Sequence, residues 1–320
     1  MIPSGFELLA IPIFIGGVLI LYKGSDILVD GTSKTAAKLG VSTLIISVLL
    51  VGFGTSAPEL AISVGAAIQN NSGISLGNVI GSCIANLLLI LGLSAIIKPI
   101  KIKKGIIKRE MPIVLGVTIV LILFSYANIL DNLHIFGALI FLILFILFVL
   151  FFIQLAHKEK NKEKKIKSGK TGKNILFIII GIISVIIGAE LLIISSVTIA
   201  ELLGIPTFII ALSMVAVGTS LPELAVSVMA AYKGESDIAI GNVLGSNVFN
   251  ILLILGLAAL FIPLNAVSSL DHITILVAVT IVMFPIIFTG SKISRSEGVV
   301  MLLFYGIFIW YAFFGYTYFI

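Results

Sequence analysis

The sequence contains few charged residues, one cysteine, one tryptophan and three histidines. Only 11% of its 320 residues are charged, about half the share of a typical soluble domain. Cys83, as the only cysteine, cannot form an internal disulfide, and the scattered histidines rule out a Cys/His metal site. With 59% hydrophobic residues and a mean hydropathy of +1.26, the chain is expected to be a polytopic membrane protein.

Long apolar runs predict an all-α membrane protein with ten transmembrane helices. The predicted spans are residues 8–36, 42–69, 73–97, 107–127, 132–155, 174–202, 207–232, 236–261, 269–288 and 297–318. A polar, basic segment separates two groups of five spans and is expected to be a solvated linker. The predicted division is a first five-helix repeat (1–156), a linker (157–173) and a second five-helix repeat (174–320).

The two halves repeat each other at an offset of 164 residues. Residues 52–97 and 216–261 share 26 identities in 46 positions without a gap, and Glu59 is matched with Glu223. This similarity indicates an internal duplication. Because each half has an odd number of predicted spans, the second half is expected to be inverted in the membrane. Inverted repeats are typical of transporters, which bind substrate near the midplane between the repeats.

Basic residues are expected to fix the orientation of the chain. Of its 20 Lys and Arg residues, all but Lys23 fall in or beside predicted loops on one side of the membrane. The positive-inside rule then places the linker in the cytoplasm and both termini outside. The net charge of +5 is explained in this way, without a nucleic-acid partner. The compact chain, which shows no targeting segment, is expected in the cell (plasma) membrane.

Two matched stretches place proline and glutamate inside apolar spans. VGFGTSAPELAIS begins at Val51 and contains Glu59, and VAVGTSLPELAVS begins at Val215 and contains Glu223. A carboxylate in the bilayer must be protonated, paired or bound to a cation. No Lys or Arg lies at this depth in the second, third, seventh or eighth span, so the two glutamates are expected to face each other around a cation. Pro58 should break its helix and free the backbone carbonyls of residues 52–54 for coordination.

The side chains around these glutamates carry oxygen and no sulfur or imidazole. Hydroxyl and amide candidates, all at matched positions, are Thr55, Thr219, Ser56, Ser220, Ser82, Ser246, Asn86 and Asn250. Hard oxygen ligands favour Ca2+, Na+ or Mg2+ over zinc, copper or iron. Because Mg2+ retains its waters, a cage built largely by protein favours Ca2+, and Na+ can share the same oxygens. Asn78 and Asn242 either support these ligands or pack helices together.

The paired motifs resemble those of a known family. GTSAPEL with GNVIGSCIAN, and GTSLPEL with GNVLGSNVFN, are similar to the two α-repeats of the calcium/cation antiporter superfamily, specifically its prokaryotic sodium/calcium exchanger branch. The resemblance covers essentially the whole chain. It implies antiport of Ca2+ against Na+ by a monomer, with no cofactor and no enzymatic activity. Ions would bind between broken helices in the second, third, seventh and eighth spans, while the first and sixth spans slide across them.

The resemblance also implies a role for each ligand. Glu59 and Glu223 would be shared by Ca2+ and Na+, and Thr55 and Thr219 would bind Ca2+. The other implied ligands are Ser56, Ser220, Ser82, Ser246, Asn86, Asn250 and the backbone carbonyls of Gly52 and Ala216. Potassium-dependent exchangers carry aspartate at the position of Asn250, which argues against potassium coupling. Two carboxylates balance one Ca2+, so its replacement by more than two Na+ would move net charge across the membrane.

Three other functions were weighed against sodium/calcium exchange. A proton/calcium exchanger of the same superfamily would use the glutamates as proton carriers, but typically carries different motifs. A cation channel would need a continuous pore, usually built by a ring of subunits. An intramembrane protease is disfavoured because no base accompanies Ser56 or Ser220.

Overall fold

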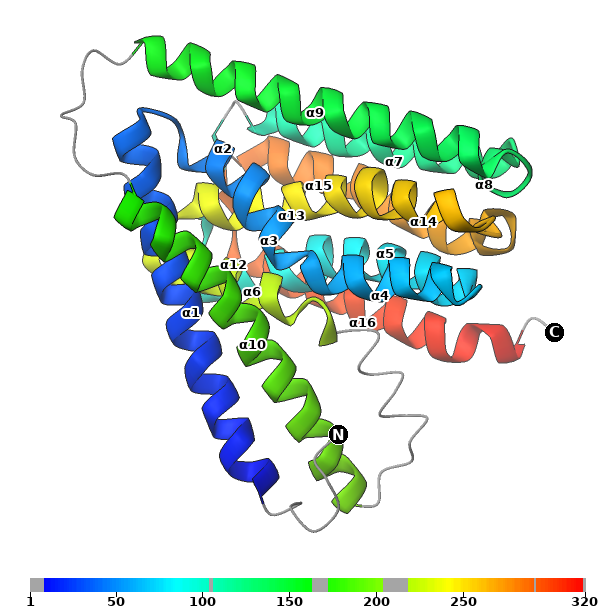
Figure 1. The fold of residues 1–320 in the computed structure, drawn as a ribbon, viewed down its shortest axis with the longest axis horizontal. Helices are drawn as coiled ribbons and strands as arrows, with labels where there is room; N and C mark the ends of the chain where they lie inside the picture. The colour runs from blue at the N-terminus through cyan, green and yellow to red at the C-terminus, as the bar shows by residue number, and fades with distance from the viewer. Residues whose placement is uncertain (1–8, 104–105, 163–171, 204–217, 291, 319–320) are drawn as a thin grey trace.

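The computed structural model describes residues 9–103, 106–162, 172–203, 218–290 and 292–318, and these form a bundle of helices (Figure 1). The first half contains α1 (Ala10–Leu39), α2 (Thr43–Ile46), η2 (Ser47–Val51), α3 (Gly52–Thr55), α4 (Ala57–Ile68), α5 (Ser72–Ala85), η3 (Asn86–Ile90), α6 (Leu91–Ile97), η4 (Ile106–Glu110), α7 (Met111–Tyr126), α8 (Ile129–Asn132) and α9 (His134–Lys162). The second half contains α10 (Gly172–Leu202), α12 (Leu221–Lys233), α13 (Ser236–Val248), η6 (Phe249–Ile254), α14 (Leu255–Phe261), η7 (Ala266–Ser269), α15 (Leu270–Gly290) and α16 (Arg295–Tyr318). Two short strands, β1 (Ile100–Lys101) and β2 (Lys292–Ile293), pair antiparallel.

The helices agree with a membrane protein. The described residues contain seven helices that are long and apolar enough to cross a membrane, or eight if the bent pair Thr43–Thr55 and Ala57–Ile68 is one span. The predicted span 207–232 overlaps residues 204–217, which lie outside the described residues. The all-helical prediction is therefore confirmed, while the count of ten spans stays a prediction. Helix α9 continues to Lys162 and α10 begins at Gly172, so helix extends into both ends of the predicted linker.

Helix breaks occur where the sequence supplies proline. The chain bends by 48° between residues 43–55 and 57–68, and Pro58 lies in the first turn of α4. Helix α12 starts in the same way after Ser220, with Pro222 in its first turn. By contrast, residues 72–97 and 236–261 each form one span through the π-helical stretches η3 and η6. Neither span contains a proline to remove a backbone donor. Their α-helix is interrupted by η3 and η6 without a bent break like that before α4, and the breaks predicted for the third and eighth spans stay a prediction.

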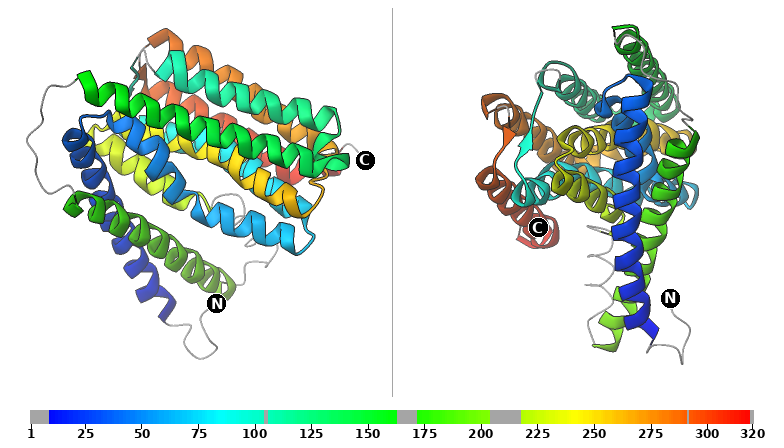
Figure 2. Two further views of the ribbon diagram at one scale, coloured as in Figure 1. Left: turned by 45° about the horizontal axis from the view of Figure 1, so that its top comes forward. Right: turned by 90° about the vertical axis from the view of Figure 1, so that its left-hand side faces the viewer.

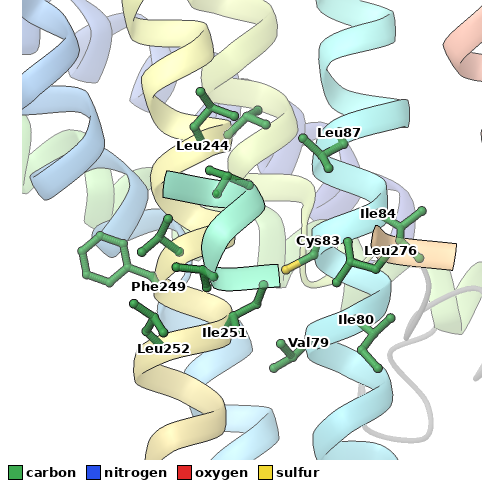
Figure 3. Packing of buried hydrophobic residues seen from close by; sticks show 14 of the residues in the cluster. Val79, Ile80, Cys83, Ile84, Leu87, Leu244, Phe249, Ile251, Leu252 and Leu276 are labelled. Carbon is green, nitrogen blue, oxygen red and sulfur yellow. The ribbon is translucent and has the colours of Figure 1, made fainter. Parts of the chain in front are cut away.

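These two spans form the centre of the molecule. Within their membrane-length windows, 72% and 83% of residues are buried, against 22% in α1 and 28% in α9. Apolar side chains fill the space between them, and Figure 3 shows Val79 and Cys83 of α5 close to Ile251 of η6. The motifs with the predicted ligands thus lie on the most enclosed helices.

Helices α1 and α10 lie side by side and run at a steep angle to the others (Figures 1 and 2). Glycines bring their backbones into contact: a Cβ at Gly24 would lie 2.7 Å from the Cβ of Ser184, and one at Gly181 would lie 2.6 Å from the Cβ of Leu28. Such close packing is typical of small residues between membrane helices. Lys233 of α12 ties this pair to the rest of the bundle through ion pairs to Asp26 (2.5 Å) and Asp30 (2.6 Å) of α1.

We expect Gly24→Leu to destabilise the protein by separating α1 from α10. Forcing extra atoms into a packed interface costs about 1–3 kcal/mol, and here the neighbouring backbone of Val185 lies 2.9 Å from the added Cβ. Gly16→Leu is the matched control, because no described atom lies within 4 Å of a Cβ at Gly16. Thermal unfolding in detergent should show a lower Tm for Gly24→Leu alone. Equal Tm values would contradict the proposed contact.

Candidate functional site

Both glutamates lie at the start of a helix, just after a break. Glu59 is in the first turn of α4 and Glu223 in the first turn of α12, each directly behind a proline. Proline suits this position because the first turn of a helix needs no backbone donor. Both side chains are buried, with 1% of their surface exposed. The duplicated GTS-PE sequence therefore builds the same local structure twice.

Serine hydroxyls link the two repeats across the site. Ser56 Oγ donates to Glu223 Oε1 at 2.9 Å, and Ser220 Oγ donates to Glu59 Oε1 at 3.3 Å. Ser246 Oγ makes a further contact with Glu223 Oε1 at 3.4 Å. Because Ser56 and Ser220 each precede a glutamate by three residues, these reciprocal bonds bring both carboxylates to one place. The prediction that the glutamates of the two repeats meet therefore agrees with these distances.

Several buried oxygens of the predicted ligands have no hydrogen-bond partner among the described residues. They are Glu59 Oε2, Glu223 Oε2, Asn86 Oδ1 and Asn250 Oδ1; the Nδ2 of Asn250 is also unpaired. A buried polar atom without a partner is costly and requires an explanation. A cation coordinated by these four oxygens would satisfy them and neutralise the carboxylates, so the donor set fits a hard cation.

Asn78 and Asn242 position the glutamates. Asn242 Nδ2 donates to the backbone carbonyl of Glu223 at 3.2 Å and to Ser227 Oγ at 3.0 Å, while its Oδ1 accepts from Thr55 Oγ1 at 3.1 Å. Asn78 makes the equivalent bonds to Glu59, Ser63 and Thr219, at 3.4, 2.9 and 3.3 Å. Each amide thus fixes a glutamate backbone of its own repeat and a threonine hydroxyl of the other. This supports the ligand-supporting role over simple helix packing.

The π-helical stretches bring a further residue into the site. Asn86 opens η3 and Asn250 is the second residue of η6; such wide turns are frequent at functional sites. Asn86 Nδ2 donates to Asn247 Oδ1 at 2.9 Å, and Asn247 Nδ2 donates to the carbonyl of Cys83 at 3.3 Å. Asn247 was not among the residues predicted from the sequence, because its counterpart in the first repeat is a cysteine. The available signal was its match at offset 164 with Cys83, the only one of the four differences between GNVIGSCIAN and GNVLGSNVFN that introduces an amide.

The remaining predicted ligands differ in their contacts. The expectation that the carbonyl of Gly52 lacks a partner is wrong, since it accepts from the backbone N of Ser56 at 3.1 Å and from Ser246 Oγ at 3.2 Å. Because Pro58 has no backbone N–H, the carbonyl that loses its helical hydrogen bond is the one four residues earlier, which belongs to Gly54. Ser82 contacts Thr219, with 3.4 Å between their hydroxyl oxygens. Ala216 lies outside the described residues.

The acidic groups here are too few for a conventional metal cluster. In the described ranges, no three His, Cys, Asp or Glu side chains gather in a way that could hold a metal ion. Any cation between Glu59 and Glu223 would therefore take its other ligands from neutral oxygens. Fewer charged ligands lower the affinity of such a site for a divalent cation.

Comparison with known proteins gives consistent matches along the chain. Residues 9–154 and 173–314 match the family described as "Sodium/calcium exchanger protein". The sodium/calcium exchanger MaX1 of Methanosarcina acetivorans is 39% identical, with 92% of this chain and 95% of that protein covered. The putative antiporter CaxA of Alkalimonas amylolytica is 32% identical, with 94% and 95% covered. A solved structure of the sodium-calcium exchanger NCX_Mj, soaked with 10 mM Na+ and zero Ca2+, matches with a TM-score of 0.81 and 34% identity, covering 94% of this chain and 98% of that one.

Proposed function

The chain belongs to the sodium/calcium exchanger family, which comprises membrane transporters rather than enzymes, and from this premise we propose that it exchanges Ca2+ for Na+ by alternating access. The observation that carries the proposal is the set of unpaired oxygens on Glu59, Glu223, Asn86 and Asn250. Two of these oxygens belong to buried carboxylates whose combined charge equals that of one Ca2+. The relatives named above as sodium/calcium exchangers point to the same pair of ions.

In this proposal, competition for the carboxylates couples the two ions. Ca2+ and Na+ both need Glu59 and Glu223, so they cannot fill the site together. An empty site would leave two uncompensated charges in the membrane interior, and this disfavours its passage from one side to the other. The loaded forms are neutralised and can cross, which enforces exchange instead of leak. Replacement of one Ca2+ by more than two Na+ makes the cycle electrogenic.

The proposed assignment of ligands keeps the predicted set. The carboxylates serve both ions, while the hydroxyls, amides and backbone carbonyls complete the coordination: Thr55, Thr219, Ser56, Ser220, Ser82, Ser246, Asn86, Asn250, Gly52 and Ala216. The hydroxyls of Ser56 and Ser220 are already directed at the carboxylates. On Ca2+ binding they would rotate so that their lone pairs face the ion.

The proposed moving part is the pair α1 and α10. It is packed internally through glycines and contacts the core at fewer points, among them the ion pairs of Lys233 with Asp26 and Asp30. Sliding of this pair across the broken helices would open the site to one side at a time. We further propose two inverted repeats, 1–156 and 174–320, joined by a cytoplasmic linker, in the cell membrane with both termini outside.

Calcium uptake into sealed vesicles with trapped Na+ tests the exchange. We expect uptake only when external Na+ is replaced by a large impermeant cation, because the outward Na+ gradient then supplies the driving force. The internal and external pH are equal in this assay. Uptake that ignores Na+ but follows an imposed pH gradient would instead establish a proton/calcium exchanger. Uptake that requires neither gradient would indicate a channel.

A further inference from the structure

The turn between α12 and α13 carries two charged side chains that reach α1. Lys233 forms ion pairs with Asp26 (2.5 Å) and Asp30 (2.6 Å), and its Nζ also donates to the backbone carbonyl of Asp26 at 3.0 Å. Glu235 accepts a hydrogen bond from Ser33 Oγ at 2.9 Å. The three residues of α1 are spaced by four and three positions, so they lie on one face of the helix. We call this set of five residues the α1–α12 latch.

The turn that carries Lys233 and Glu235 has a fixed shape. Gly234, between them, has a φ of 81°, in the left-handed region that glycine adopts at little cost. Its backbone N donates to the carbonyl of Ala231 at 2.9 Å, and the backbone N of Glu235 donates to the carbonyl of Ala230 at 2.8 Å. These bonds close the C-terminus of α12. Both charged side chains are therefore held at the end of α12, and they belong to the core rather than to the pair α1 and α10.

The first repeat lacks this latch. At the offset of 164 residues, the matched pairs are Asp26 with Glu190, Asp30 with Ile194, Ser33 with Val197, Lys233 with Gln69, and Glu235 with Asn71. Without a cation at Gln69, the first repeat cannot form the equivalent ion pairs. Packing differs in the same sense, because α1 packs on α12, whereas the described residues show no comparable packing between the equivalent helices α10 and α4.

We propose that the α1–α12 latch favours the form of the protein whose ion site is open to the outside, an inference that rests on the proposed alternating access. The neighbouring Lys34 and Lys38 place this end of α1 in the cytoplasm by the positive-inside rule. While the latch is closed, α1 is held against the core there, which shuts the cytoplasmic path. In an inverted repeat, the two halves exchange their arrangements between the two forms. Identical latches would balance each other, but a latch in one half shifts the equilibrium toward the outward-open form.

Distances between two spin labels on the purified full chain test the proposal. The labels are attached to Ile11→Cys in α1 and Ile68→Cys in α4, at positions 61% and 59% exposed, while the buried Cys83 stays unlabelled. Pulsed electron–electron double resonance with saturating Na+ should show two populations of distances, with the latched one dominant. Lys233→Gln, which introduces the residue type of the first repeat, should lower the ratio of latched to unlatched protein about five-fold, the order expected for partly exposed ion pairs.

Three further variants separate the latch from effects of net charge and folding. Lys34→Gln is the matched control, because it removes the same charge and breaks only an ion pair with Asp30 inside α1. It should leave the ratio unchanged, as should Lys233→Arg, which keeps the cation. Gln69→Lys adds the missing cation at an exposed position matched with the acidic Glu190 partner. It should lower the ratio by stabilising the unlatched form, without lowering the Tm.

The possible failures are distinguishable. If Lys233→Gln leaves the ratio unchanged while replacement of Na+ by Ca2+ still alters it, the latch is overturned and the proposed exchange is not. A change in Lys34→Gln as large as in Lys233→Gln would overturn the latch in favour of a general effect of net charge. A single distance in every variant and with either ion would overturn both the proposed alternating access and the latch.

Discussion

Glu59→Gln is expected to reduce Na+-driven Ca2+ uptake by about 100-fold or more. Removing one member of a buried charge pair costs about 3–5 kcal/mol, and each 1.4 kcal/mol is a factor of ten in affinity. Glutamine keeps the size of the side chain but carries no charge, so only half of the charge that balances Ca2+ remains, on Glu223. Glu223→Gln should have a similar effect, because both carboxylates are equally buried and both keep an unpaired oxygen.

The same variant separates loss of binding from loss of folding. Without ions, the two carboxylates repel each other, so Glu59→Gln should unfold at the same or a higher temperature than the unmodified protein. Added Ca2+ should raise the Tm of the unmodified protein by mass action and leave that of the variant unchanged. Glu201→Gln, at an exposed position of α10, is the control and should preserve both uptake and the Ca2+-dependent rise. Substantial uptake by Glu59→Gln would contradict the assigned role of the carboxylate.

The membrane class and the approximate positions of most helices could be predicted from apolar runs, because a span needs about 20 apolar residues whatever it packs against. The meeting of Glu59 and Glu223 could also be predicted, since duplication places equivalent residues at one interface. The break before α4 was predicted correctly from Pro58, because the loss of a backbone donor is a local effect. In the third and eighth spans, which contain no proline, the α-helix is interrupted by η3 and η6, and these π-helical stretches were not predicted from the sequence.

The hydrogen bonds within the site could not be predicted in the same way. A spacing of four residues places Thr55 and Glu59 on one helix face, yet the Thr55 hydroxyl bonds to Asn242 of the other repeat. Such partners depend on how two distant helices are rotated against each other, which sequence spacing does not specify. Asn247 could not be identified from its own repeat, because its role arises from the hydrogen bond with Asn86 of the other repeat.

Asn242→Leu is expected to be the most damaging substitution outside the proposed ligands. Leucine has a similar volume but removes three hydrogen bonds of Asn242. These join it to the Ser227 hydroxyl, to the carbonyl of Glu223 and to the Thr55 hydroxyl, which keeps only the carbonyl of Gly52 at 3.4 Å. Each unpaired buried group costs about 1–3 kcal/mol. Even if only about 2.8 kcal/mol of this loss affects the geometry of Glu223, the apparent affinity for Ca2+ falls about 100-fold.

The test compares four variants in the vesicle assay and by thermal unfolding. Asn242→Leu should raise the apparent KM for Ca2+, whereas Asn132→Leu, at an exposed position, should not. Thr55→Val removes the hydroxyl that bonds to Asn242, so the double variant should cost less than the sum of the two single changes. Additive effects would show that Asn242 and Thr55 act independently. If Asn242→Leu lowers the Tm but leaves the apparent KM for Ca2+ unchanged, Asn242 contributes only to packing. A residue that positions Glu223 must change the binding of Ca2+ in the molecules that remain folded.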